Sequence, residues 1–61
     1  MARIIKLDHA SFNRQYPAKI VKKANLPKNV LRVSESKSFT VYGMGRQNYI
    51  VAKPGCKLVW D

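Results

Sequence analysis

The sequence predicts a small, mainly β domain with one short helix. The chain has 61 residues, which is enough for a single domain. Residues 38–60 read SFTVY, GMGRQN, YIVAK, a Pro-Gly corner and CKLVW, so apolar stretches alternate with strong turn signals. Short stretches of this kind, rich in β-branched and aromatic residues, are typical of strands joined by tight connections. We therefore expect the core to form around this part of the chain.

Five segments have the alternation or the apolar content of short strands. They are residues 2–7, 30–34, 38–42, 48–53 and 57–60. We expect them to pair antiparallel in a curled sheet or a small, partly open barrel, because a flat sheet of this size leaves its apolar face in water. The predicted core consists of the inward-facing apolar side chains, namely Ile5, Leu7, Ile20, Leu31, Val33, Phe39, Val41, Ile50, Leu58 and Trp60.

Residues 17–25, PAKIVKKAN, fit two interpretations. In a helix, Pro17 takes the first position, where its missing N–H costs nothing, and Asn25 ends the helix just before Pro27. In a strand, the neighbours Ile20 and Val21 point to opposite faces and alternation fails. The helix is favoured, and because isolated helices under about 12 residues are marginal, it must lie on the sheet.

The connections differ in how clearly they are encoded. Residues 53–56, Lys-Pro-Gly-Cys, predict a type II turn with Pro and Gly in its central positions. Residues 43–47 carry two glycines spaced by one residue, which suits a hairpin loop. Residues 8–11 form a polar break, and residues 12–16 fit either an irregular loop held by Phe12 and Tyr16 or a single helical turn capped by Ser11.

The sequence contains little from which a disulfide, a metal site or a membrane segment can be built. Cys56 is the single cysteine, and His9 and three acids are the other possible metal ligands. No stretch approaches the roughly 20 apolar residues of a membrane span, and no apolar signal segment is present. A basic amphipathic helix at 17–28 has too small an apolar face to lie on a membrane. We therefore expect an intracellular, cytoplasmic protein with no metal and no membrane partner.

No motif indicates catalysis or a cofactor. General acid–base chemistry requires paired titratable groups, and the chain offers His9 and three acids. Cys56 as a nucleophile would need His9 as its base, and a cysteine between a turn and an apolar strand is more often a small core residue. The Gly-x-Gly-Arg of residues 43–46 lacks the Gly-Lys-Ser/Thr ending and the following helix of a phosphate-binding loop. The sequence predicts a protein that is not an enzyme.

The charge is the strongest functional observation. Twelve Lys and Arg against three acids give a formal charge of +9, and such an excess attracts polyanions at long range. We predict a non-enzymatic module that binds nucleic acid, either DNA or RNA. A regulatory function is one role that such binding can serve. Its expected contacts are phosphate-binding cations and tyrosines that stack on bases, namely Lys19, Lys22, Lys23, Lys28, Tyr42, Arg46, Tyr49, Lys53 and Lys57.

A second class of function fits the same composition. A small phage- or plasmid-type regulator or inhibitor can dock on an acidic surface of a host protein, steered by charge and held by a few aromatic or Arg residues. The candidates for that role are Phe12, Arg14, Tyr16 and Trp60. Several edge strands also offer a route to a homodimer. Cations gathered on one face favour nucleic acid, whereas an even scatter beside an apolar patch favours a protein partner.

Overall fold

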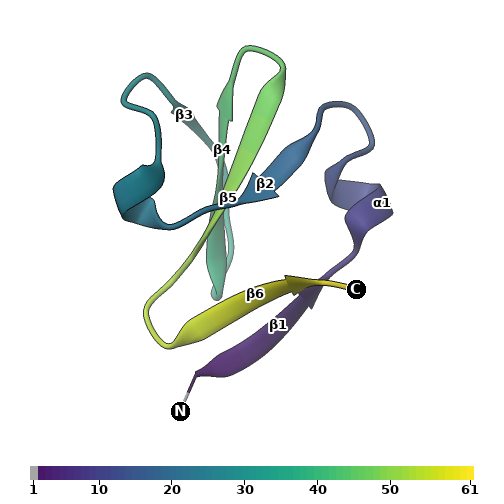
Figure 1. Ribbon diagram of the computed structural model, residues 1–61, viewed down its shortest axis with the longest axis vertical. Helices are drawn as coiled ribbons and strands as arrows, with labels where there is room; N and C mark the ends of the chain where they lie inside the picture. Colours follow the sequence, from purple (N-terminus) through teal and green to yellow (C-terminus); the bar gives the residue numbers. More distant parts are fainter. Residues whose placement is uncertain (1) are drawn as a thin grey trace.

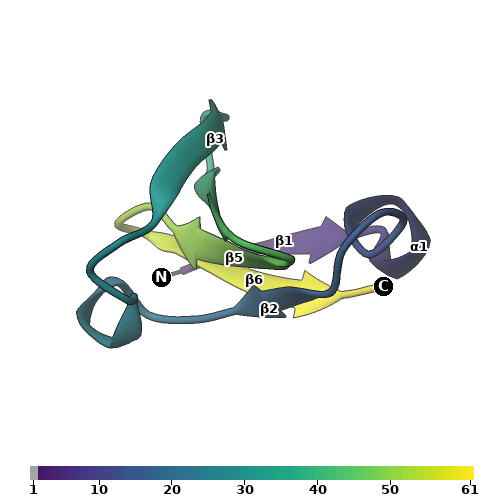
Figure 2. The same cartoon turned by 90° about the horizontal axis from the view of Figure 1, so that it is seen from above.

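The computed structural model describes residues 2–61 and consists mainly of β-strands, as the sequence predicts (Figure 1). Its elements follow in the order β1 (Arg3–Leu7), α1 (His9–Phe12), β2 (Ala18–Ile20), η1 (Lys23–Asn25), β3 (Leu31–Glu35), β4 (Phe39–Met44), β5 (Gln47–Ala52) and β6 (Cys56–Trp60). They form two sheets, with strand orders β2-β5-β4-β3 and β1-β6. The β1–β6 pair crosses below the larger sheet (Figures 1 and 2), and the sheets do not close into a barrel.

The β4–β5 hairpin is the centre of the larger sheet. Its antiparallel register runs from Phe39↔Ala52 to Met44↔Gln47, and Gly45 and Arg46 form the turn between the strands. Gly45 has φ 61°, while no non-glycine residue among the described ones has a positive φ. Glycine in the first central position is the signature of a type II′ turn, whose twist matches that of the flanking strands. The predicted hairpin is confirmed.

The predicted Pro-Gly turn redirects the chain from β5 into β6. The Cys56 N–H donates to the Lys53 carbonyl at 3.0 Å, and Gly55 has φ 84°. This hydrogen bond and a positive φ in the second central position define the type II turn. The chain therefore leaves the larger sheet here and builds the smaller one.

The expectation that all strands are antiparallel is wrong for two pairs. β1 pairs with β6 in parallel, from Arg3↔Cys56 to Leu7↔Trp60, and β2 pairs with β5 in parallel. Parallel strands are joined by long connections, so no tight-turn signal in the sequence predicts which strands pair in this way. The β1–β6 pair instead places the first and the last strand of the chain side by side (Figure 1).

The predicted helix over residues 17–25 is also wrong. Ala18–Ile20 form a strand, and only Lys23–Asn25 form a short 3₁₀ turn. The edge of β5 supplies hydrogen-bond partners that a short isolated helix lacks, and the Val21 N–H donates to the Ile50 carbonyl at 3.0 Å. Asn13 holds the start of β2, because its side-chain oxygen accepts the Ala18 N–H at 2.8 Å. Tertiary pairing thus outweighs the local helix signals.

The core lies between the two sheets. Its buried members are Leu7, Ala18, Val41, Ile50 and Leu58, and the partly buried side chains packed on them are Ile5, Phe12, Ile20, Phe39, Ala52 and Trp60. Two predicted core residues are exposed, since Leu31 and Val33 keep 76% and 64% of their surface. They belong to β3, which is an edge strand with an irregular register between Arg32 and Ser34. Apolar and polar residues do alternate along β3, but none of the described helices or strands packs over that edge of the sheet, so the apolar side chains stay exposed.

The helical turn of this region is α1, His9–Phe12, so it lies in the predicted polar break and Ser11 is inside it; the expectation of a turn capped by Ser11 is wrong, and residues 13–16 form a loop. Asp8 precedes α1 without capping it through its side chain, and the Ser11 hydroxyl donates to the Asp8 carboxylate at 2.6 Å. The turn delivers Phe12 to the core, where its ring meets Phe39 and Trp60 edge-on at centroid distances of 5.7 and 6.2 Å. These aromatic contacts fix the corner where α1 meets both sheets.

Candidate nucleic-acid interface

Strand register brings two tyrosines and two cations into one row across the larger sheet. Tyr42 of β4 lies directly opposite Tyr49 of β5. Tyr49 is in register with Lys19 of β2, and Tyr42 with Arg32 of β3. Residues in register project to the same face of a sheet. Lys19, Tyr49, Tyr42 and Arg32, here called the tyrosine row, therefore lie side by side on one face.

The tyrosine row lies on the face of the larger sheet opposite Val41 and Ile50, and this face is partly covered, because Thr40 and Val51, two positions from Tyr42 and Tyr49, are also buried. The neighbouring positions on β4 and β5, Val41 and Ile50, are buried between the sheets, and successive side chains of a strand alternate between faces. Both tyrosines are half-buried, whereas Lys19 and Arg32 are exposed. With adjacent strands about 4.8 Å apart, the row spans roughly 14 Å from Lys19 to Arg32. It offers two aromatic rings in the middle and a positive charge at each end.

Arg32 was not among the predicted binding residues, and one acid lies next to it. Arg32 Nη1 is 3.7 Å from Glu35 Oε1, and Lys53 Nζ is 3.6 Å from Glu35 Oε2. These pairs are solvent-exposed, with 66% of the Arg32 side chain accessible, so they are weak. Lys53, a predicted phosphate contact, thus shares this acid with Arg32. A signal for Arg32 existed, because alternation in residues 30–34 already places it opposite to Leu31 and Val33.

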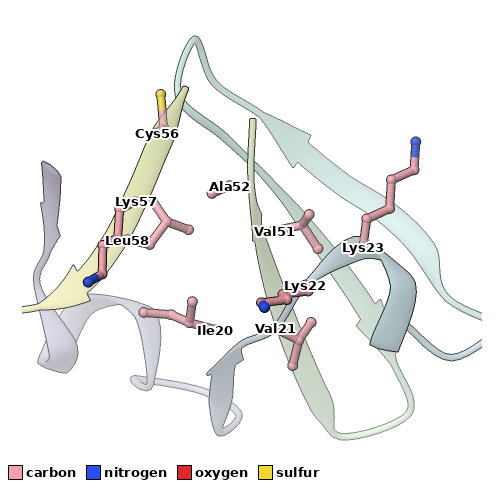
Figure 3. Close-up of a pocket in the computed structure, with 9 residues that line it drawn as sticks. All are labelled: Ile20, Val21, Lys22, Lys23, Val51, Ala52, Cys56, Lys57 and Leu58. Atoms are coloured by element: carbon pink, nitrogen blue, oxygen red, sulfur yellow. The ribbon is translucent and has the colours of Figure 1, made fainter. Parts of the chain in front are cut away.

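Lys22, Lys23 and Lys57 border another part of the surface. Together with Val51 they line one hollow, although Lys57 lies far from the other two in the sequence. Val51 follows Tyr49 by two positions on β5, roughly 6.6 Å along the strand, and projects to the same face. Lys22 and Lys23 therefore lie beside the tyrosine row, on the connection that leaves β2. In Figure 3 the Lys23 side chain points away from the hollow.

The remaining predicted contacts stand apart from these groups. Lys28 lies in an exposed turn before β3, and Arg46 is exposed at the tip of the β4–β5 hairpin. Of the candidate anchors for a protein partner, Phe12 and Trp60 are packed on the core. Arg14 is exposed and Tyr16 is half-buried. Of the predicted cations, one lies in the tyrosine row, three border one hollow and the others stand apart, so they do not cover one continuous face.

The described part of the chain holds few groups suited to other chemistry. Among residues 2–61, no three His, Cys, Asp or Glu side chains lie close enough together to hold a metal ion. His9 packs edge-on against the Trp60 ring at a centroid distance of 5.0 Å, and Cys56 carries a free, partly exposed thiol. Within the same residues, no helix has the length and apolar character needed to cross a bilayer.

Comparison of the chain with protein-family models, with curated proteins and with solved structures finds no match.

Proposed function

We propose that the protein is a non-enzymatic module that binds single-stranded nucleic acid across the tyrosine row. The observation that carries the proposal is the register Lys19–Tyr49–Tyr42–Arg32, which sets two adjacent rings between two cations on the face opposite Val41 and Ile50. Aromatic side chains on a sheet are stacking platforms for unpaired bases, and flanking cations hold the phosphates between them.

A single strand fits this surface better than a duplex. Bases inside a double helix are already stacked on one another and cannot reach a ring that lies on a sheet. In a flexible single strand, two neighbouring bases can lie on Tyr42 and Tyr49 while the backbone passes Lys19 and Arg32. Lys22 and Lys23, beside the row, extend the path of positive charge. Recognition of this type is tolerant of sequence, because every base has a face that can stack.

The charge of the whole chain strengthens the local attraction. With a formal charge of +9, the protein draws polyanions from a distance, and the acids number only three. If about four phosphates are neutralised, the logarithm of the affinity falls with the logarithm of the salt concentration at a slope near −2.8 for a single strand. For a duplex the same count gives a slope near −3.6.

The test is a titration of dye-labelled single- and double-stranded oligonucleotides, of DNA and of RNA, followed by fluorescence anisotropy at two salt concentrations. We expect saturable binding that is tighter for single strands and has the salt dependence given above. An absence of saturable binding at low salt removes the proposal. Tighter binding of the duplex removes the stacking role of the tyrosines and leaves only attraction by charge.

A further inference from the structure

The two sheets leave an open seam between β5 and β6. It is a hollow of about 460 Å³ lined by Ile20, Val21, Lys22, Lys23, Val51, Ala52, Cys56, Lys57 and Leu58. Figure 3 shows Ile20 and Leu58 projecting into the space between the two strands. Lys22 and Lys57 border the hollow from opposite walls, the Lys57 side chain points to the other face of β6, and the lining contains no acid. This volume and this apolar floor are typical of binding sites.

One wall of the seam is a strand edge without a partner. Among the strands of residues 2–61, β6 pairs with β1 alone, and two backbone hydrogen bonds show which of its residues face β1. The Arg3 N–H donates to the Gly55 carbonyl and the Asp61 N–H donates to the Leu7 carbonyl, each at 2.8 Å. Pairing in a strand alternates, so the N–H and carbonyl groups of Leu58 point to the other edge, toward the seam. Trp60 shares this orientation. An unpaired edge of this kind is a template for another strand.

From this geometry we propose that the seam binds an extended, acidic peptide segment of a partner protein by strand addition to β6. Side chains of the added strand alternate between the two faces of the pair. Those on the face of Cys56 and Leu58 enter the apolar hollow, so they are apolar. Those on the opposite face lie beside Lys57, so acidic residues are favoured there as cross-strand partners. The recognised segment therefore alternates apolar and acidic residues.

A second copy of the chain is a poor occupant of the same seam. Each copy carries a formal charge of +9 and only three acids, so two copies repel one another. Two of those acids, Asp8 and Asp61, do not lie in strands, and Glu35 is already within 3.7 Å of Arg32. An acidic partner is instead attracted to the positively charged protein at long range. This inference shares Lys22 with the proposed nucleic-acid path but uses no residue of the tyrosine row, so it does not depend on base stacking.

The test uses a short capped peptide of alternating valine and glutamate, added to the full-length protein. In the free protein, amide hydrogen exchange at Leu58 and Trp60 should be faster than at Lys57 and Val59, whose N–H groups face β1. The peptide should slow exchange at Leu58 and Trp60 and slow the reaction of Cys56 with a thiol reagent. Cys56 is the sole cysteine, so that reaction reports on this site alone.

Three control peptides separate strand addition from simpler causes. Lysine in place of glutamate removes the charge match, serine in place of valine removes the apolar side chains, and backbone N-methylation removes the ladder hydrogen bonds. Each of these peptides should give no protection at Leu58 or Cys56. Equal protection by the lysine or the N-methylated peptide overturns the inference, and so does an absence of protection by the valine–glutamate peptide.

Matched protein variants test the electrostatic part. Lys57→Glu should weaken binding of the valine–glutamate peptide roughly three- to tenfold, because an attractive cross-strand pair becomes repulsive. Lys28→Glu makes the same charge change in an exposed turn outside the seam and should weaken it less. Equal effects contradict a role for Lys57 at the seam. Protection of Leu58 that rises with protein concentration, without peptide, assigns the seam to a second copy and also overturns the inference.

Discussion

Truncation of the paired tyrosines is the perturbation that measures most directly whether bases stack on the sheet. Stacking of a base on an aromatic side chain contributes about 1–3 kcal/mol per base. At 1.4 kcal/mol per factor of ten, Tyr42→Ala or Tyr49→Ala should each weaken binding of a single-stranded oligonucleotide roughly 5- to 150-fold. Phenylalanine keeps the ring, so Tyr49→Phe should change the affinity by less than about threefold.

The structure also predicts how the two truncations combine. Tyr42 and Tyr49 are direct cross-strand partners, so each orients the ring of the other. The free-energy losses of the single variants should therefore not add in the double variant, as is usual for residues in contact. The assay is fluorescence anisotropy with a labelled oligonucleotide, on variants first shown to be folded by thermal melting followed through the fluorescence of Trp60.

The third tyrosine of the chain provides the matched control. Tyr16 is half-buried like the other two, but it lies in the loop between α1 and β2, outside the tyrosine row. Tyr16→Ala should leave the affinity for the oligonucleotide within about twofold, as expected for a ring without a stacked base. The stacking argument is refuted if Tyr42→Ala and Tyr49→Ala bind as wild type does, or if Tyr16→Ala weakens binding as much as they do.

Three further predictions concern the turn, the core and the acid beside the site. Gly55 has φ 84° and open space where a Cβ would stand, so Gly55→Ala should cost about 1–2 kcal/mol of unfolding free energy in urea denaturation, and no loss would contradict the turn assignment. Ile50 is fully buried, so Ile50→Val should cost about 0.5–1.5 kcal/mol in the same assay. Leu31→Ala, at an exposed edge position, should stay within about 0.5 kcal/mol, and equal losses would refute the placement of the core. Glu35→Gln removes the acid that pairs with Arg32 and Lys53, so it should tighten oligonucleotide binding up to about fivefold at low salt. Asp61→Asn makes the same charge change away from these cations and should tighten binding less. Equal effects of the two variants would show that only the net charge of the protein matters.

The parts of the fold that sequence predicts well are those encoded by neighbouring residues. The Gly45 and Gly55 turns require positive φ values that glycine adopts without strain, so the β4–β5 hairpin and the start of β6 follow from local chemistry. Alternation in the same region also places Val41 and Ile50 in the core. Tyr42 and Tyr49 then fall on the outer face by the same reasoning.

The parts that sequence does not predict depend on distant pairing. Residues 17–25 carry the end signals of a helix in Pro17 and Asn25, and pairing with the free edge of β5 makes Ala18–Ile20 a strand instead. Ile20 and Val21 looked incompatible with a strand because both are apolar neighbours, yet β2 ends at Ile20 and Val21 lines the seam beyond it. Without β2 beside β5, the place of Lys19 in the tyrosine row cannot be seen from sequence.

The most direct test of the central claim is a map of amide chemical shifts by NMR as a single-stranded oligonucleotide is added to the full-length protein. Binding across the sheet predicts that the largest shifts occur at Lys19, Arg32, Tyr42 and Tyr49, the four residues that register places in one row. Small shifts scattered over all the cations, or shifts confined to the seam around Lys57, would contradict it.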